Sequence, residues 1–107
     1  MKRIKVGEDE PIEVPFTTRE RALILDHTFA DPQLTDRLRT ATVRQAKLLA
    51  RLTLYDIEEL CGCIAAEAHH TKDKGLQREL QRLFERLTRL MERYDDGNWQ
   101  TNFELSH

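Results

Sequence analysis

The sequence predicts a mainly α-helical domain of about four helices, with one or two short strands before the first and third helices. Three observations support this fold class. Threonine and aspartate caps precede stretches with a helical period, two short apolar stretches alternate with polar residues, and a leucine-rich stretch near the end repeats by four and three. We expect residues 1–96 to form a single helical domain and residues 97–107 a short C-terminal tail.

The first predicted element is a short strand at "IEVPF". Ile12, Val14 and Phe16 alternate with polar residues and with Pro15. Because proline has no N–H to donate, it is tolerated only where a strand makes no hydrogen bond at that position. The pattern therefore predicts an edge strand.

Two helix starts follow this strand. Thr17 and Glu20 have the spacing of a capping box, which predicts a helix that runs to about His27 or Thr28. Asp31 is followed directly by proline, and aspartate caps a helix well while proline suits its first position. A second helix is therefore expected to begin there.

Residues 40–52 fit two interpretations. Apolar residues spaced by four and three suit a continuous helix, whereas the alternation over 48–52 suits a strand. Context favours the strand, because Thr53 and Asp56 repeat the earlier layout of a threonine cap with an acid three residues later. The likeness continues from "HTFADPQL" to "HTKDKGLQ", so we interpret the chain as a possible degenerate tandem repeat of strand, helix, loop and helix.

The last two helices are expected from about Leu54 to His70, and from Gly75 to the stop signal "DDG". The third helix has one apolar arc, composed of Leu54, Ile57, Leu60, Cys61, Ile64, Ala65 and Ala68. Gly62 inside it suggests that another segment packs close to its backbone. In the fourth helix the four-and-three stripe consists of Leu76, Leu80, Leu83, Leu87, Leu90 and Tyr94.

Composition limits the classes of function. The 107 residues are 39% hydrophobic and 34% charged, with a formal net charge of −2, which suits a folded amphipathic protein without global attraction to nucleic acid or anionic membranes. No apolar run approaches the roughly 18 residues of a membrane span. Two cysteines spaced C-x-C cannot form an ordinary disulfide within a helix, which agrees with a reducing compartment. We expect a cytoplasmic protein.

One face of the third helix has the residue types of a metal site. Cys63, Glu67 and His70 share this face with Glu59, and thiolate, carboxylate and imidazole groups all bind zinc, iron or manganese. A solvated helix face with no cofactor explains the same pattern more simply, because a histidine suits the C-terminal end of a helix. Glutamates one turn on either side of Cys63 should raise its pKa, which argues against a nucleophilic thiol.

The fourth helix also has a basic face. It consists of Arg78, Arg82, Arg86, Arg89 and Arg93. Such a face could contact phosphates as an accessory nucleic-acid site, but glutamates border it and no aromatic residue interleaves with the arginines on that face as a single-strand binder would need. A solvated charged surface is the favoured interpretation, and nucleic-acid binding is not expected.

The sequence has no glycine-rich phosphate loop, no G-x-S-x-G and no H-E-x-x-H, so we favour a non-enzymatic protein. The expected function is a helical protein–protein interaction module or assembly subunit, and the expected partner is a second copy of the chain or another protein. This expectation rests on Phe84 and Met91, which widen the apolar stripe of the fourth helix along one edge. Trp99 and Phe103 in the tail compete to cover that edge.

Overall fold

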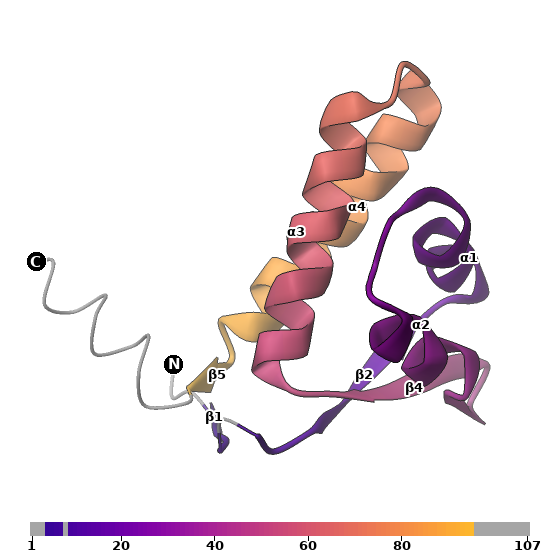
Figure 1. Ribbon diagram of the computed structural model, residues 1–107. Coiled ribbons are helices and arrows are strands. Elements are labelled where there is room, and N and C mark those ends of the chain that lie inside the picture. Colours follow the sequence, from indigo (N-terminus) through magenta and orange to yellow (C-terminus); the bar gives the residue numbers. More distant parts are fainter. Residues whose placement is uncertain (1–3, 8, 96–107) are drawn as a thin grey trace, which may run out of the picture.

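The computed structural model describes residues 4–7 and 9–95. It confirms the predicted fold class, with four helices and a small three-stranded antiparallel sheet of order β2-β4-β3 (Figure 1). The elements are β1 (Ile4–Lys5), β2 (Ile12–Phe16), α1 (Thr18–His27), α2 (Pro32–Arg39), β3 (Thr42–Arg44), β4 (Lys47–Leu52), α3 (Leu54–His70), α4 (Lys74–Met91) and β5 (Tyr94–Asp95). In the described ranges no helix is both long and apolar enough to cross a membrane.

Strand β2 lies at one edge of the sheet, as predicted. Val14 and Phe16 are buried, whereas Glu13, which precedes them, is exposed and Pro15 between them is half-buried. Pro15 lies opposite Leu49 of β4. The Pro15 carbonyl accepts a hydrogen bond of 2.9 Å from Nη2 of Arg86, a residue of α4. This edge therefore offers no donor at Pro15, and the acceptor there is already occupied.

Residues 42–52 form a β-hairpin, which settles the ambiguity over residues 40–52 in favour of strands. The hairpin supplies β3 in addition to the predicted strand β4. Its two turn residues, Gln45 and Ala46, have φ values of 52° and 65°. Both values fit a type I′ hairpin turn, which needs positive φ at both central positions and usually has asparagine or glycine there. Because neither is present, the turn has no sequence signal and β3 was not expected.

The predicted helix starts are confirmed. In the Thr17 capping box, the threonine hydroxyl accepts from the Glu20 amide at 3.0 Å and the Glu20 carboxylate accepts from the Thr17 amide at 2.9 Å. Thr53 and Asp56 form an equivalent box, with distances of 3.1 and 3.0 Å. Asp31 caps α2 by accepting from the amide of Gln33 at 2.8 Å.

The core lies between the inner face of the sheet and the four helices. Helices α3 and α4 run side by side as a long pair that extends away from the sheet (Figure 1). Helix α4 buries Leu80, Leu83 and Leu87 completely or almost completely. Helix α3 buries the predicted arc with one exception: Ala65 is exposed. The predicted core positions are therefore largely confirmed.

Three further expectations need correction. Gly62 is exposed and a Cβ added there would meet no atom within 4 Å, so the inferred close packing is wrong. Helix α4 begins at Lys74 and ends at Met91. Tyr94, expected at the end of its leucine stripe, instead pairs in β5 with Ile4 of β1, in a short parallel contact that the sequence did not reveal. The predicted tail, residues 97–107, lies outside the described residues.

Candidate functional site

The residues of the predicted metal site lie along one side of α3. Cys63 and Glu67 are half-buried, and His70 is exposed at the end of the helix. Glu59, on the same face, accepts a hydrogen bond of 2.8 Å from the hydroxyl of Tyr55. Within residues 4–7 and 9–95, no three or more His, Cys, Asp or Glu side chains are grouped so that they could hold a metal ion. Metal binding at this face stays a prediction.

Neither cysteine has the environment of a reactive thiol. Burial raises the pKa of Cys61 to about 11. Partial burial, and then the negative charges of Glu59 and Asp31, raise the pKa of Cys63. Since the thiolate is the nucleophilic form, both side chains are held in their less reactive state at neutral pH.

The arginine face of α4 is interrupted by a structural contact. Arg86 donates to both carboxylate oxygens of Glu20 at 2.9 Å, in addition to the Pro15 carbonyl. Its guanidinium also lies 5.5 Å from the centre of the Phe16 ring. Arg86 thus ties α4 to β2 and α1 and is not available to a phosphate backbone. The other four arginines of this face are exposed, and one of them, Arg89, pairs with Glu85 at 3.7 Å.

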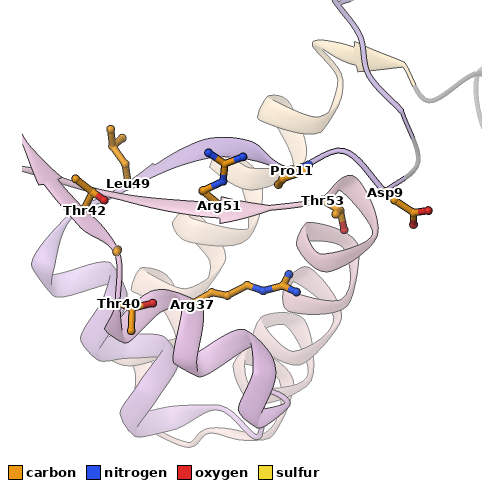
Figure 2. Close-up of a pocket in the computed structure, with 9 residues that line it drawn as sticks. Asp9, Pro11, Arg37, Thr40, Thr42, Leu49, Arg51 and Thr53 are labelled. Carbon is orange, nitrogen blue, oxygen red and sulfur yellow. The ribbon is translucent and has the colours of Figure 1, made fainter.

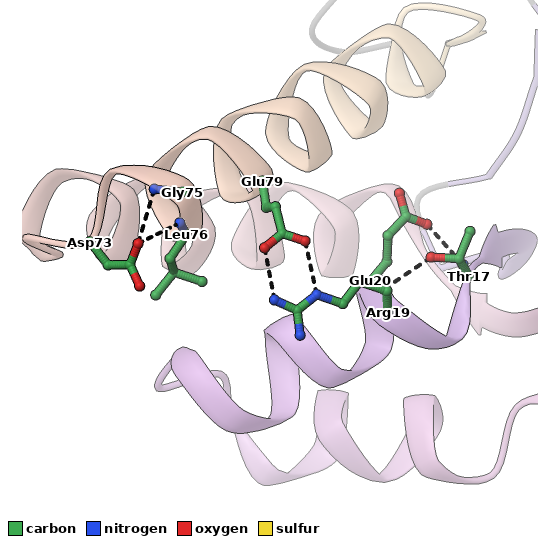
Figure 3. Close-up of polar contacts among 7 residues, drawn as sticks. All are labelled: Thr17, Arg19, Glu20, Asp73, Gly75, Leu76 and Glu79. Atoms are coloured by element: carbon green, nitrogen blue, oxygen red, sulfur yellow. Dashed lines mark hydrogen bonds and ion pairs between the residues drawn. The ribbon is translucent and has the colours of Figure 1, made fainter.

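A second ion pair joins α1 to α4 nearer the start of α4. Arg19 donates to both carboxylate oxygens of Glu79, at 2.8 and 2.7 Å (Figure 3). These hydrogen bonds and the positive charge of Arg19 lower the pKa of Glu79. In the same view, Asp73 caps α4 by accepting from the amides of Gly75 and Leu76. The α1-facing side of α4 therefore serves the fold.

The other side of α4 borders a groove, which we call the Phe84 groove. It has a volume of about 270 Å³ and is lined by Ala65, Ala68, His69, Gln77, Gln81 and Phe84. The side-chain amide of Gln77 donates to the backbone carbonyl of Ala68 at 2.9 Å and so joins α4 to α3 at one end of the groove. Phe84 and Met91, the predicted interaction residues, are half-buried and pack against the core. Trp99 and Phe103 lie outside the described residues.

A larger cavity lies beside β4 and was not predicted from the sequence. It has a volume of about 420 Å³ (Figure 2). Its lining is Asp9, Pro11, Arg37, Thr40, Ala41, Thr42, Leu49, Arg51 and Thr53. These residues come from three separate stretches of the chain and form no spaced motif, so only the fold brings them together.

Comparisons with family models, curated proteins and solved structures found no match to this chain. Its function must therefore be inferred from the surfaces described above.

Proposed function

We propose that this protein is a non-enzymatic protein–protein interaction module that self-associates through the Phe84 groove. The observation that supports this is the position of Phe84, a large aromatic side chain left half-buried in a groove that two alanines, a histidine and two glutamines also line. Helix α4 satisfies its internal packing with Leu80, Leu83 and Leu87, so the edge with Phe84 remains for a partner.

The groove has the features of a surface that fits a copy of itself. A two-fold dimer brings the same patch together twice, so a protruding group and a hollow must lie on one surface. The half-buried ring of Phe84 offers an apolar contact at the groove, and exposed Ala65 allows close approach of a second helix. Helices of 17 and 18 residues are about 26 Å long, which is enough length for a standard interface of about 800 Å² per partner.

Oligomeric state tests the proposal. Replacing Ala65 by arginine places a long charged side chain in the groove without removing any core side chain. We expect Ala65→Arg to convert a dimer to a monomer in light scattering coupled to size-exclusion chromatography. Ala66→Arg is the matched control, because Ala66 is equally exposed, is next in sequence and does not line the groove. Both variants should retain the helical circular dichroism of the parent chain.

Three outcomes would contradict the proposal. The full chain could be monomeric at all accessible concentrations, or both arginine variants could remain dimeric. The third is a monomer that associates only after Trp99 and Phe103 are changed to serine, which would identify the tail as the cover of the groove. Phe84→Glu provides a second test, since a charge at the centre of a desolvated contact weakens association strongly.

A further inference from the structure

The cavity beside β4 lies where the sheet stops being fully paired. Strand β3 begins at Thr42, which pairs with Leu49, whereas the antiparallel strand β4 continues past Leu49 to Leu52. On its other side, β4 pairs with β2 along its last five residues, 48–52. One edge of β4 therefore remains without a strand partner beyond Leu49, and the cavity is found at this edge.

The register shows which backbone groups face the cavity side. Pro15 has no N–H and its carbonyl is held by Arg86, so Pro15 and Leu49 do not exchange hydrogen bonds across the sheet. In antiparallel pairs this condition recurs every second residue, so Arg51, opposite Glu13, also directs its N–H and carbonyl away from β2. Both groups point along the unpaired edge of β4, because β3 does not extend that far.

The side chain of Arg51 adds a charge at the same place. It is exposed, lines the cavity, and makes no ion pair within the part of the chain that the structure describes. Arg37 lies across from it on α2 (Figure 2). Nη1 of Arg37 donates to Oδ2 of Asp56, a monodentate contact that leaves the Nη2 and Nε donors of the guanidinium for another acceptor.

Hydroxyl groups complete the donor set. The Thr40 hydroxyl donates to the Asp36 carbonyl, and the Thr53 hydroxyl accepts from the Asp56 amide. Among the described residues, Thr42 is the cavity threonine whose hydroxyl has no such partner. The lining also includes one acid, Asp9. Two arginines, a hydroxyl and a strand-edge N–H therefore line one cavity, and the acceptors among its described lining residues include the Asp9 carboxylate and the strand-edge carbonyl of Arg51.

We propose that this cavity binds a small organic anion through a carboxylate or phosphate group held by Arg51 and Arg37. Arginine matches the planar, multiple-acceptor geometry of both oxyanions. A volume of about 420 Å³ is within the range of small-molecule sites and leaves room for a short body beyond the anionic group, against Pro11 and Leu49. This site shares no lining residue with the Phe84 groove, so the anion-binding proposal can be tested independently of self-association.

Titration of the full-length ¹⁵N-labelled protein with inorganic phosphate and with succinate tests the site. We expect saturable shifts of the amide signals of Arg51, Thr42 and Thr53, and the probe with the higher affinity identifies the class of anion. Arg51→Gln should weaken binding about tenfold or more, because it removes a charge-assisted hydrogen bond. Arg89→Gln makes the same change of charge on α4, outside the cavity, and should bind as the parent does.

A second variant tests the sign of the effect. Asp9→Asn removes the one acid among the described lining residues and should strengthen phosphate binding several-fold, since its charge no longer opposes the ligand. The proposal is overturned if neither probe gives saturable shifts at these amides. It is equally overturned if Arg51→Gln, with the dispersed amide spectrum of a folded protein, binds as tightly as the parent. Equal weakening by Arg51→Gln and Arg89→Gln would indicate only general charge attraction and would also reject the site.

Discussion

The two strand-to-helix junctions of this protein, β2 to α1 and β4 to α3, are built from the same local parts. Each has an inward-facing strand, a threonine cap and an acid in a complete capping box. In each, an arginine from a distant element binds the acid of the box: Arg86 binds Glu20, and Arg37 binds Asp56. The strands of the two junctions pair with each other, with Val14 opposite Ala50 at the centre.

The junctions differ in how many nitrogens of the arginine side chain bind other groups of the protein. Arg86 binds both oxygens of Glu20 and the Pro15 carbonyl through Nε and Nη2 and lies near the Phe16 ring, so two of its three nitrogens are engaged in the fold. Arg37 makes its contact with Asp56 through one nitrogen, and the rest of its guanidinium borders the cavity. The same local design therefore supports packing at the first junction and leaves donors for a ligand at the second.

The largest effect on stability is expected when the arginine contact at the first junction is removed. Arg86→Ala should lower the free energy of unfolding by about 2–3 kcal/mol, because the half-buried Glu20 carboxylate and the Pro15 carbonyl both lose their partner. Arg37→Ala should lower it by about 1 kcal/mol or less, because Arg37 contacts Asp56 through one nitrogen and Asp56 still accepts from the Thr53 amide. Urea denaturation followed by circular dichroism measures both values.

Arg89→Ala is the control for loss of an arginine on α4, since its pair with Glu85 is exposed and should contribute about 0.5 kcal/mol or less. If Arg86→Ala were no more destabilising than Arg37→Ala, the two junctions would be energetically equivalent and the distinction drawn between them would be wrong.

The parts of each junction that the sequence predicted are the local ones. A capping box needs only four consecutive residues, so Thr17 with Glu20 and Thr53 with Asp56 were recognisable at once. The arginine partners were not, because Glu20 and Arg86 are 66 residues apart and Arg86 looked like any other member of an exposed basic face. Long-range pairing depends on the fold, and spacing along one helix does not report it.

The same reason explains what the sequence missed at the candidate sites. The cavity exists because β3 begins only at Thr42 and leaves the last residues of β4 without a partner on that side. Strand β3 itself depends on a turn at Gln45 and Ala46 that has neither asparagine nor glycine. By contrast, the proposed role of Phe84 was inferred from local sequence, because Phe84 lies beside the leucine stripe of α4; that role stays a prediction. The metal face at Cys63, Glu67 and His70 and the tandem repeat stay predictions.

An effect of intermediate size is expected for the capping boxes, and it tests whether the Thr17 and Thr53 boxes contribute equally to stability. Thr17→Ala and Thr53→Ala each remove a hydroxyl that accepts from the first turn of a helix, and each should lower the free energy of unfolding by about 1 kcal/mol. Thr28→Ala is a control in which the lost hydroxyl only donates to a carbonyl of the preceding turn. A difference of more than about 1 kcal/mol between the two cap variants would show that the boxes are not equivalent in strength.

The smallest expected effect concerns the pair of Arg19 and Glu79, a link between α1 and α4 that has no counterpart at the second junction. Both side chains are exposed, so the pair should contribute little at neutral pH. Its pH dependence nevertheless has a definite sign. Arg19 lowers the pKa of Glu79 in the folded chain. The stabilisation is therefore fully present above the unfolded glutamate pKa of about 4.3, and it is lost as the pH falls through the lower folded value.

Denaturation of the parent and of Glu79→Gln at neutral and at acid pH measures how much the Arg19–Glu79 pair contributes to the free energy of unfolding. The glutamine variant should be slightly less stable than the parent at neutral pH, and the difference should shrink as the solution is acidified, because protonated Glu79 resembles glutamine. Glu85→Gln is the matched control, since Glu85 pairs with Arg89 within α4 and does not link the two helices. A difference that stayed constant from neutral to acid pH would mean that the effect of Glu79 does not come from its charge. The ion pair would then have no role in holding α1 against α4, and Arg86 would be the principal polar link at the first junction.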